Sequence, residues 1–312
     1  VTAQETVDSF IDGSVLTEPE SVLFKAKALI RNQICAGKKR ILMVVDWSSI
    51  EYILLMGYCG ETDKVKKFAD GLDPYIDFGT KLFDKPYDQI TGDERQRSKP
   101  PVLGSGYMLG WRGLIEYADG YGVKMTPSEA QYATNLYRKD NPLVVKRWYA
   151  LKEAAHMSIA NKGQSYTIGA TTFRCVKKGK FNWLIMTLPS GRSLFYCEPR
   201  LVQGQYGQTI ACLGVNPKTK KWGKVFVNPQ RIIENIIQGL GRDILETALA
   251  KLRKENYKPI FTVYDEIACE EPIEYSEERF AKMISIMCEP PTWARHLPLK
   301  AEGYMAKRYR KE

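Results

Sequence analysis

Two short apolar runs of the sequence each end in acidic residues. The run LMVVD ends at Asp46, and the run FTVYDE ends at Asp265 and Glu266. Carboxylate oxygens with no softer ligand nearby suit Mg²⁺, which prefers oxygen ligands and keeps water molecules that substrate phosphates replace. Taken alone, each acid is explained as well by a solvated turn. Taken together, they predict two adjacent strands that present carboxylates at one edge of a sheet.

A cationic segment carries the complementary charge. In RQRSKPPVLGSGYMLG (residues 95–110), Arg95, Lys99, Leu103 and Tyr107 recur at every fourth position and would share one face of a helix. Arginine binds polyphosphate through a bidentate fork and lysine binds it as a point charge. The alternative is a solvated basic face, because DERQRSK is a run of charges.

The same segment contains two prolines, Pro100 and Pro101, where a helix tolerates them least. In one interpretation the helix restarts at Pro100 and directs its free N–H groups, with Lys99, towards phosphate. In the other the helix is continuous and kinked. We favour the continuous helix.

The flanking sequence predicts an α+β fold. RILMVVDW (residues 40–47) is typical of a buried strand, and SSIEYILLMGY (48–58) of a helix. Residues 61–165 are mostly helical in pattern, whereas residues 166–227 contain short strand-like runs separated by turn residues. Helical patterning is also present in residues 20–34.

The C-terminal part adds a long helix and a hairpin. Asn228 is a candidate N-cap and Pro229 a candidate first-turn residue for an amphipathic helix that continues to about residue 256. KPIFTVYDEIACEEP (residues 258–272) is apolar on both sides of its acidic pair, which indicates a strand–turn–strand hairpin.

Composition limits the partners. The 312-residue chain is 44% apolar, with a net charge of +10 and a pI near 9.1, which favours anionic partners such as nucleic acid. The seven cysteines contain no CxxC pair and the two histidines are isolated, which disfavours a zinc site and indicates reduced thiols. No apolar run approaches the roughly 18–20 residues of a membrane span, and no signal peptide is visible. We therefore expect no membrane partner and a cytoplasmic location, which for a viral protein is the host cytoplasm.

Three blocks, in this order, resemble motifs of the A-family DNA polymerases, the polymerase I family, in the form seen in bacteriophages. They are VVDWSSIE (44–51), RQRSKPPVLGSGYMLG (95–110) and VYDE (263–266). TLPSGRSLFY (187–196) and ENIIQGLGRDIL (234–245) support the resemblance, which extends from about residue 31 to the C-terminus. Each block is a weak match alone, and the ordered set is specific.

The resemblance implies a two-metal site. Asp46 and Asp265 would bind two Mg²⁺ ions, for which Mn²⁺ is a substitute, with the backbone carbonyl of Trp47 as a further ligand. Glu266 would flank the second acid as a catalytic residue. Two such ions activate an attacking hydroxyl and stabilise a leaving pyrophosphate.

The resemblance also implies a dNTP site. Arg95 and Lys99 would bind the triphosphate, and Tyr107 would pack beside the sugar and the nascent base pair. Glu51 would lie against the 2′ position and exclude ribonucleotides. Two alternatives stay open: Tyr107 is a plain core aromatic, or Glu51 forms a capping box with Ser48.

Four positions depart from the family pattern, and one of them is Glu234, which occupies a slot where an amide is often found. Leu103 replaces the usual aromatic of the nucleotide site, and Tyr75, in DPYID, replaces a phosphate-binding histidine of that site. Tyr264 replaces the histidine of V-H-D-E near the primer end, so it is assigned to the DNA-binding set. An aliphatic side chain lacks a stacking face, and a phenol cannot act as a cation.

Two residues of the long helix complete the predicted DNA contacts. Gln238 and Arg242, one turn apart, would face the template–primer. The alternative is a surface network in which Gln238 interacts with Glu234 and Arg242 on the polar face of the helix.

The expected architecture is a right-hand polymerase palm with inserted, mostly helical fingers. The palm would comprise residues 1–60 and 236–312, and the fingers residues 61–235. Only 45 residues precede Asp46, so neither a thumb nor an exonuclease domain is expected in this chain. We therefore expect a part of a longer polymerase, a piece that needs a thumb or exonuclease partner chain, or a minimal enzyme. Because the chain begins with Val1, we also expect a fragment or a processed product.

The expected reaction is template-directed addition of dNTPs to the 3′-OH of primer–template DNA. A catalytically silent nucleic-acid-binding module and a single-subunit RNA polymerase are the alternatives. A reverse transcriptase fits less well, because paired aspartates would be expected where YDE stands.

Overall fold

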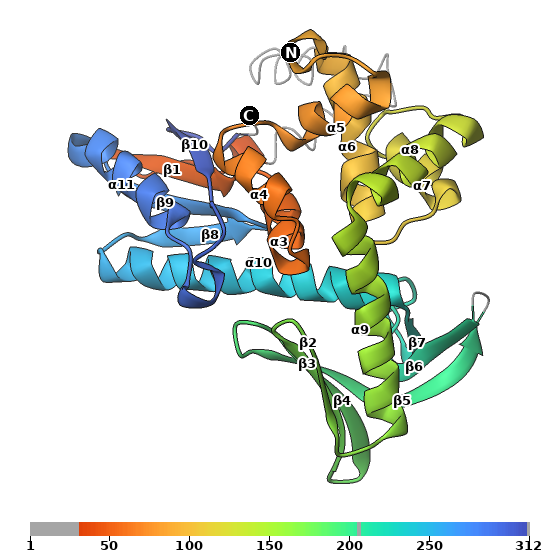
Figure 1. Ribbon diagram of the computed structural model, residues 1–312. Coiled ribbons are helices and arrows are strands. Elements are labelled where there is room, and N and C mark those ends of the chain that lie inside the picture. Colours follow the sequence, from red (N-terminus) through yellow and green to blue (C-terminus); the bar gives the residue numbers. More distant parts are fainter. Residues whose placement is uncertain (1–30, 205–206, 311–312) are drawn as a thin grey trace, which may run out of the picture. The chain divides into compact units, whose positions relative to one another are not determined.

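The computed structural model describes residues 31–204 and 207–310 (Figure 1). Helices and two antiparallel sheets confirm the α+β class. The chain divides into two compact units, and each is described by itself. The first contains the described residues of 1–48, 245–289 and 299–312, and the second contains residues 49–244 and 290–298. Most of the helix predicted for residues 20–34 lies outside the described residues.

The first unit is built on a four-stranded antiparallel sheet in the order β10-β1-β9-β8. Strand β1 (Arg40–Trp47) lies between β10 (Ala301–Ala306) and β9 (Glu266–Pro272), and β8 (Pro259–Val263) forms an edge. Residues 42–45 of β1 are all buried. This burial explains why the strand is a continuous apolar run, and it confirms the strand predicted there.

Both faces of this sheet are covered. Helix α11 (Ser276–Cys288) packs on β1 and β10, and the Trp47 indole Nε1 donates a 2.7 Å hydrogen bond to the Met287 carbonyl. A short 3₁₀ turn, η3 (Ile273–Tyr275), precedes this helix. A second apolar cluster consists of Ala36, Leu42, Val44, Ala268, Tyr304 and Tyr309.

Strands β8 and β9 form the predicted hairpin. Val263 pairs with Glu266, so Tyr264 and Asp265 form a two-residue turn. Tyr264 has a backbone φ of 55° and its side chain is 94% exposed. A left-handed tyrosine without packing contacts is unusual, since two-residue hairpin turns normally use glycine or asparagine at such positions.

The second unit contains the predicted run of helices. They are α3 (Ile50–Cys59), α4 (Thr62–Ala69), α5 (Pro74–Phe83), α6 (Gly92–Gly106), α7 (Trp111–Asp119), α8 (Pro127–Asp140) and α9 (Pro142–Ala160), with 3₁₀ turns η2 (Tyr87–Gln89) and η4 (Thr292–Ala294). Both α6 and α8 begin with a capping box, formed by Thr91 with Glu94 and by Thr126 with Glu129.

The strand-like runs after residue 165 form one six-stranded antiparallel meander, which confirms the predicted strands. The sheet order follows the sequence: β2 (Ser165–Ile168), β3 (Thr171–Lys178), β4 (Phe181–Thr187), β5 (Ser193–Gly204), β6 (Gly207–Val215) and β7 (Trp222–Val227). Helix α9 packs on β2 and β3 (Figure 1). Phe173, Leu184 and Met186 are fully buried side chains of this sheet.

Helix α10 (Pro229–Lys254) begins as predicted. The Asn228 side chain accepts a 2.9 Å hydrogen bond from the Arg231 backbone N–H, which is an N-cap contact. The boundary between the two units falls within this helix, after Ile244. Across the described parts of the chain, no helix is both long and apolar enough to cross a membrane.

Candidate active site

Asp46 and Asp265 meet at one end of the sheet in the first unit. Asp46 lies near the C-terminal end of β1, next to the start of β9, where Val45 pairs with Ile267. Asp265 occupies the turn that leads into β9, and the two side chains are hydrogen-bonded to each other. The predicted meeting of the acids is therefore confirmed, but their strands are not adjacent, because β9 separates β1 from β8.

The Asp46 carboxyl holds its proton unusually tightly. Partial burial, the charge and hydrogen bond of Asp265, and the charge of Glu266 together raise its pKa from 3.8 to about 7, although the Trp47 backbone N–H opposes this shift. Two carboxylates in contact cannot both ionise without repulsion, so one proton is retained between them. A divalent cation would remove that repulsion by replacing the proton.

Glu266 has a partner of its own. Its Oε1 accepts a 2.5 Å hydrogen bond from the Tyr309 hydroxyl, and the Arg31 guanidinium lies 5.4 Å from the Tyr309 ring centroid. Burial raises the Glu266 pKa, and Asp265 adds to the rise, whereas Tyr309 and Arg31 lower it. Glu266 thus adds its negative charge to the surroundings of Asp46 while Tyr309 binds one of its oxygens.

The donor set fits hard divalent cations. Asp46 and Asp265 offer carboxylate oxygens, which Mg²⁺ and Mn²⁺ prefer. Within residues 31–204 and 207–310, no group of three or more His, Cys, Asp or Glu side chains is arranged to hold a metal ion. The structure provides two neighbouring carboxyl groups, Asp46 and Asp265, and the contribution of the Trp47 carbonyl stays a prediction.

Helix α6 carries the predicted cationic face. It runs without interruption from Gly92 to Gly106, with Pro100 and Pro101 inside it. The restart at Pro100 is therefore wrong, and the continuous helix is confirmed. The capping box at its N-terminus supplies the start that the prolines would otherwise have to provide.

Arg95 is tied to Asp73, a residue that sequence reasoning missed. The Arg95 Nε and Nη2 atoms donate hydrogen bonds of 2.8 and 2.6 Å to Asp73 Oδ2. The other oxygen, Oδ1, accepts from the backbone N–H groups of Tyr75 and Ile76 and so caps α5. An aspartate before a proline could have been recognised as an N-cap, but nothing in the sequence pairs it with Arg95.

Tyr75 brings the two cations of α6 together. The Arg95 guanidinium lies 5.3 Å and the Lys99 ammonium 5.8 Å from the centroid of its ring. Burial raises the Tyr75 pKa, and a hydrogen bond with Ser49 lowers it. Three predicted nucleotide-site residues thus share one place in the second unit, in an arrangement that cation–π attraction stabilises.

Glu51 connects two other predicted residues. Its Oε2 accepts a 2.6 Å hydrogen bond from the Tyr107 hydroxyl, and its Oε1 accepts a 2.7 Å hydrogen bond from the Gln238 amide. Burial and the Glu51 charge raise the Tyr107 pKa well above its usual range. The Glu51 carboxylate is half-buried and both of its oxygens accept hydrogen bonds, so it is held in one orientation. A residue that selects a substrate by its shape requires such a fixed orientation.

One of the alternative interpretations is wrong. The N-cap of α3 is Ser49, which makes no side-chain cap, and Ser48 donates to Glu302, so no capping box includes Glu51. The Tyr107 hydroxyl has a defined partner in Glu51, and its place beside the nucleotide stays a prediction. Gln238 also contacts Glu51, and its role in binding the template–primer stays a prediction.

The remaining predicted residues have less defined surroundings. Leu103 is half-buried on α6, and Arg242 is exposed on α10 one turn after Gln238. Tyr264 extends into solvent at the β8–β9 turn. Their roles in binding nucleotide or DNA stay predictions.

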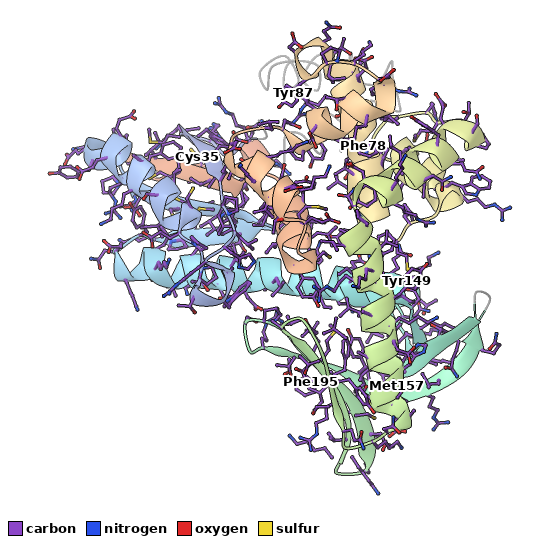
Figure 2. The ribbon with its side chains drawn as sticks, viewed as in Figure 1. Cys35, Phe78, Tyr87, Tyr149, Met157 and Phe195 are labelled. Atoms are coloured by element: carbon purple, nitrogen blue, oxygen red, sulfur yellow. The ribbon has the colours of Figure 1, made fainter. Side chains whose placement is uncertain are left out.

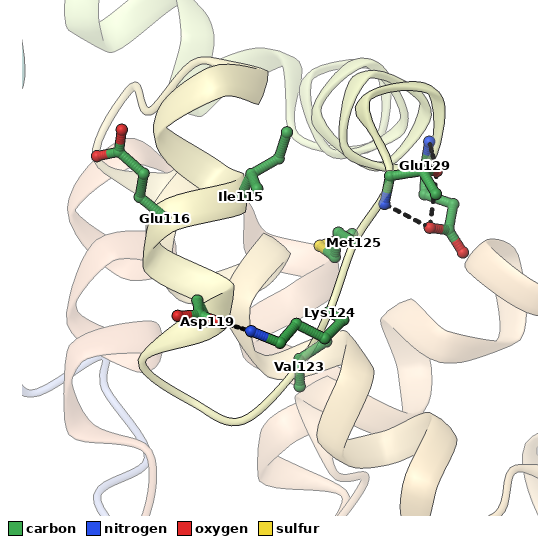
Figure 3. A pocket seen from close by; sticks show the side chains of 8 residues that line it. Ile115, Glu116, Asp119, Val123, Lys124, Met125 and Glu129 are labelled. Atoms are coloured by element: carbon green, nitrogen blue, oxygen red, sulfur yellow. Dashed lines mark hydrogen bonds and ion pairs between the residues drawn. The ribbon is translucent and has the colours of Figure 1, made fainter.

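A cavity of about 490 Å³ lies between α7 and the start of α8 (Figure 3). Three of its four charged side chains already have partners: Lys124 pairs with Asp119, and Glu129 accepts from Thr126 and pairs with Arg97. None of the predicted catalytic or substrate-binding residues lines it. The cavity therefore does not compete as an active site.

Comparison with known proteins agrees with this fold. No family model matches the chain. It is 27% identical over 294 residues to a DNA polymerase of Bacillus phage SP02, a match that covers 93% of this chain and 44% of that protein. It is 31% identical over 115 residues to DNA polymerase I of Aquifex aeolicus (strain VF5), which covers 36% of this chain and 20% of that protein.

A solved structure has the same fold. It is the POL domain of Pol1 from M. smegmatis in complex with DNA primer–template and dNTP, with a TM-score of 0.61 and 17% identity. The match covers 89% of this chain and 42% of that one. The chain thus has the fold of that polymerase domain and is similar in sequence to a phage DNA polymerase and a bacterial DNA polymerase I, which confirms the resemblance seen in the motifs. The chain spans less than half the length of these relatives.

Proposed function

We propose that the chain carries the template-directed polymerase activity of a DNA polymerase, adding dNTPs to a primer 3′-OH and releasing pyrophosphate. The observation that carries this proposal is the hydrogen-bonded pair of Asp46 and Asp265 at one end of a polymerase-type sheet. This pair has a raised proton affinity and a donor set suited to Mg²⁺ or Mn²⁺.

The two acids hold metal ions in this proposal. When bound, two Mg²⁺ ions supply charge neutralisation at the primer hydroxyl and at the triphosphate. Asp46 and Asp265 fix the position of that charge, and both must be deprotonated to do so. Glu266 keeps the local potential negative while Tyr309 binds its Oε1.

The cationic face of α6 binds the triphosphate. Arg95 keeps Nη1 for phosphate while Asp73 holds its Nε and Nη2 atoms, so the guanidinium is oriented before substrate arrives. Lys99 adds a point charge, because its ammonium lies 5.8 Å from the Tyr75 ring centroid. Such charge-assisted contacts to phosphate are among the strongest hydrogen bonds in proteins.

Glu51 selects the sugar. Hydrogen bonds from Tyr107 and Gln238 fix its carboxylate, and a rigid group beside C2′ would exclude a ribonucleotide hydroxyl by contact. Leu103 provides an apolar surface in place of an aromatic one. Tyr264, Gln238 and Arg242 contribute to primer–template binding in this proposal.

The test is primer extension on a short primed template with Mg²⁺ and dNTPs. The parent chain is expected to extend the primer, Asp265→Asn to fail, and Glu274→Gln, which alters an exposed acid of the same unit, to extend normally. A parent chain that binds primed DNA but never extends it, even with thumb or exonuclease domains added in trans, would be a silent binding module. Preferential incorporation of NTPs would instead identify an RNA polymerase.

The proposal includes partners beyond the substrate. DNA affinity should fall steeply with salt, because phosphate contacts release counterions. A thumb or exonuclease domain, on the same polypeptide or on a partner chain, would supply the grip on duplex that this proposal does not assign to the described residues. The working location is the cytoplasm.

A further inference from the structure

One face of the six-stranded sheet exposes an unusual number of large apolar side chains. They are Phe181, Phe195, Leu213, Val215, Trp222 and Phe226. Trp222 is 64% exposed, Phe195 59% and Phe226 50%. Phe195 is labelled on the sheet in Figure 2.

The strand register places these residues on the same face. Directly opposed residues of antiparallel strands share a face, and so do residues two apart on one strand. Val215 of β6 pairs with Trp222 of β7. Cys197, which is two residues after Phe195 on β5, pairs with Leu213 of β6. The Trp183 ring joins β4 to this face, with edge contacts to Phe181 and Phe195 at centroid distances of 6.3 and 6.4 Å.

The opposite face is the one that builds the core of the unit. Phe173, Leu184 and Met186 are buried there, and α9 packs on β2 and β3. The Tyr196 hydroxyl accepts a 2.9 Å hydrogen bond from Asn235 of α10. The sheet therefore does not need the aromatic face for its own packing, and a large exposed apolar patch commonly marks a binding surface.

Charge identifies the kind of partner. Residues 165–227 contain ten lysines and arginines but a single acid, Glu198, and that acid is bonded to Asn182. This segment thus carries almost all of the chain's net charge of +10. Lysines also lie on the aromatic rings, since the Lys224 ammonium is 5.1 Å from the Phe226 centroid and the Lys180 ammonium 5.3 Å from the Phe181 centroid.

We propose that this aromatic face of β4–β7 binds single-stranded DNA. Aromatic rings offer stacking platforms for unpaired bases, and the surrounding cations attract the phosphate backbone; this combination is the one that binds single strands without sequence readout. An apolar protein interface would not require such an excess of positive charge. The face includes none of the proposed catalytic residues, and binding there needs neither metal ion nor dNTP.

The test measures binding of a fluorescein-labelled oligo(dT) by fluorescence anisotropy, without metal ion or dNTP. The double variant Trp222→Leu with Phe226→Leu keeps apolar bulk but removes two flat rings, and we expect its affinity to fall about 10-fold or more. Tyr149→Leu removes an exposed aromatic of α9 outside the sheet (Figure 2) and should bind like the parent. Far-UV circular dichroism and thermal melting check that each variant is folded.

Two further measurements locate the bound oligonucleotide on the protein. Lys224→Gln should lower the slope of log affinity against log salt by about 0.7, the value for one lost phosphate contact to a single strand. An oligonucleotide that carries 5-iodo-deoxyuridine should photo-crosslink to peptides within residues 181–227. Crosslinks confined to other parts of the chain would overturn the proposal.

Parent-like affinity of the folded double variant would also overturn it. If the parent then self-associates in light scattering and Trp222→Glu abolishes that association, the face is an interface between copies. The oligo(dT) binding result can be separated from the proposed polymerase function. Asp265→Asn should retain full oligo(dT) affinity, and a failure of primer extension would leave the binding result unchanged.

Discussion

The two units arrange charge in opposite ways. In the first unit, Asp46 and Asp265 come into contact with Glu266 nearby, and the pKa of Asp46 rises to about 7 because the like charges have no adequate counter-charge. In the second unit, Arg95 is matched by Asp73, and Lys99 lies near the Tyr75 ring. The acidic site therefore needs a ligand to relieve its repulsion, whereas Arg95 of the cationic site has a counter-charge before any ligand arrives. We refer to the acidic site as the unbalanced site and to the site of Arg95 as the balanced site.

This difference fits the expected ligands. A small divalent cation binds most strongly where negative charge is concentrated. The repulsion between such charges lowers the stability of the fold, and functional sites commonly show this loss. A flexible polyphosphate gains more from donors that are already oriented, because less freedom is lost on binding.

The largest partial loss of activity is expected at the balanced site. Arg95→Ala should lower kcat/KM for dNTP incorporation by roughly 100-fold, since a charge-assisted phosphate contact is lost, and it should also lower the melting temperature. Asp73→Asn is the sharper variant, because asparagine retains the α5 cap but not the ion pair. It should raise KM several-fold with a smaller change in kcat. An unchanged KM would mean that Asp73 does not orient Arg95.

The next prediction concerns the unbalanced site and has the opposite sign. Asp46→Asn removes like-charge repulsion, so at pH 8 without metal ion it should raise the melting temperature by roughly 2 °C or more while abolishing activity. The parent's folded-state pKa of about 7 lies above the usual 3.8, so the parent loses this stability as pH rises from about 4 to about 7. The advantage of the variant should therefore shrink as the pH is lowered towards 4.

Mg²⁺ provides the control for that variant. It should raise the melting temperature of the parent more at pH 8 than at pH 6, because the carboxyls must lose their proton to bind it. Asp46→Asn should respond weakly at both pH values. If Asp46→Asn melts at a lower temperature than the parent at pH 8, like-charge repulsion does not destabilise the acidic site, and the contrast between the two units fails.

A smaller effect is expected at Glu51. Tyr107→Phe removes one hydrogen bond to the carboxylate and should cost about 1 kcal/mol of unfolding free energy, at the low end for charged acceptors because the site is half-exposed. It should also lower the preference for dNTP over NTP in incorporation assays. Tyr117→Phe, which removes an exposed hydroxyl bonded to Tyr121, is the matched control and should keep that preference.

The smallest effect is expected at the β8–β9 turn. Tyr264→Gly should raise the unfolding free energy by about 0.5–1 kcal/mol, because glycine adopts a φ of 55° without strain and little packing is lost. Denaturant unfolding measures this change. If the same variant weakens primer–template binding, the strained tyrosine is kept for its contact with DNA.

Local patterns were enough for several elements. The apolar run before Asp46 specified a buried strand, Asn228 and Pro229 specified the start of α10, and alternation with turn residues specified the strands after residue 165. Each of these depends on interactions within a few residues or on burial of a continuous stretch. Pro100 and Pro101 suggested a helix start at Pro100, and that alternative was wrong because the capping box at Thr91 starts α6 earlier.

By itself the sequence determined the order of motifs, the acids and cations that could do chemistry, and the elements that carry them, because spacing and composition are local properties. Only the tertiary structure decided the partners: Asp73 for Arg95, Tyr309 for Glu266, and the shared hold of Tyr107 and Gln238 on Glu51. It also placed β9 between the strands that lead to the two acids. These contacts join residues far apart in the chain, and packing and strand order, which no local pattern encodes, bring them together.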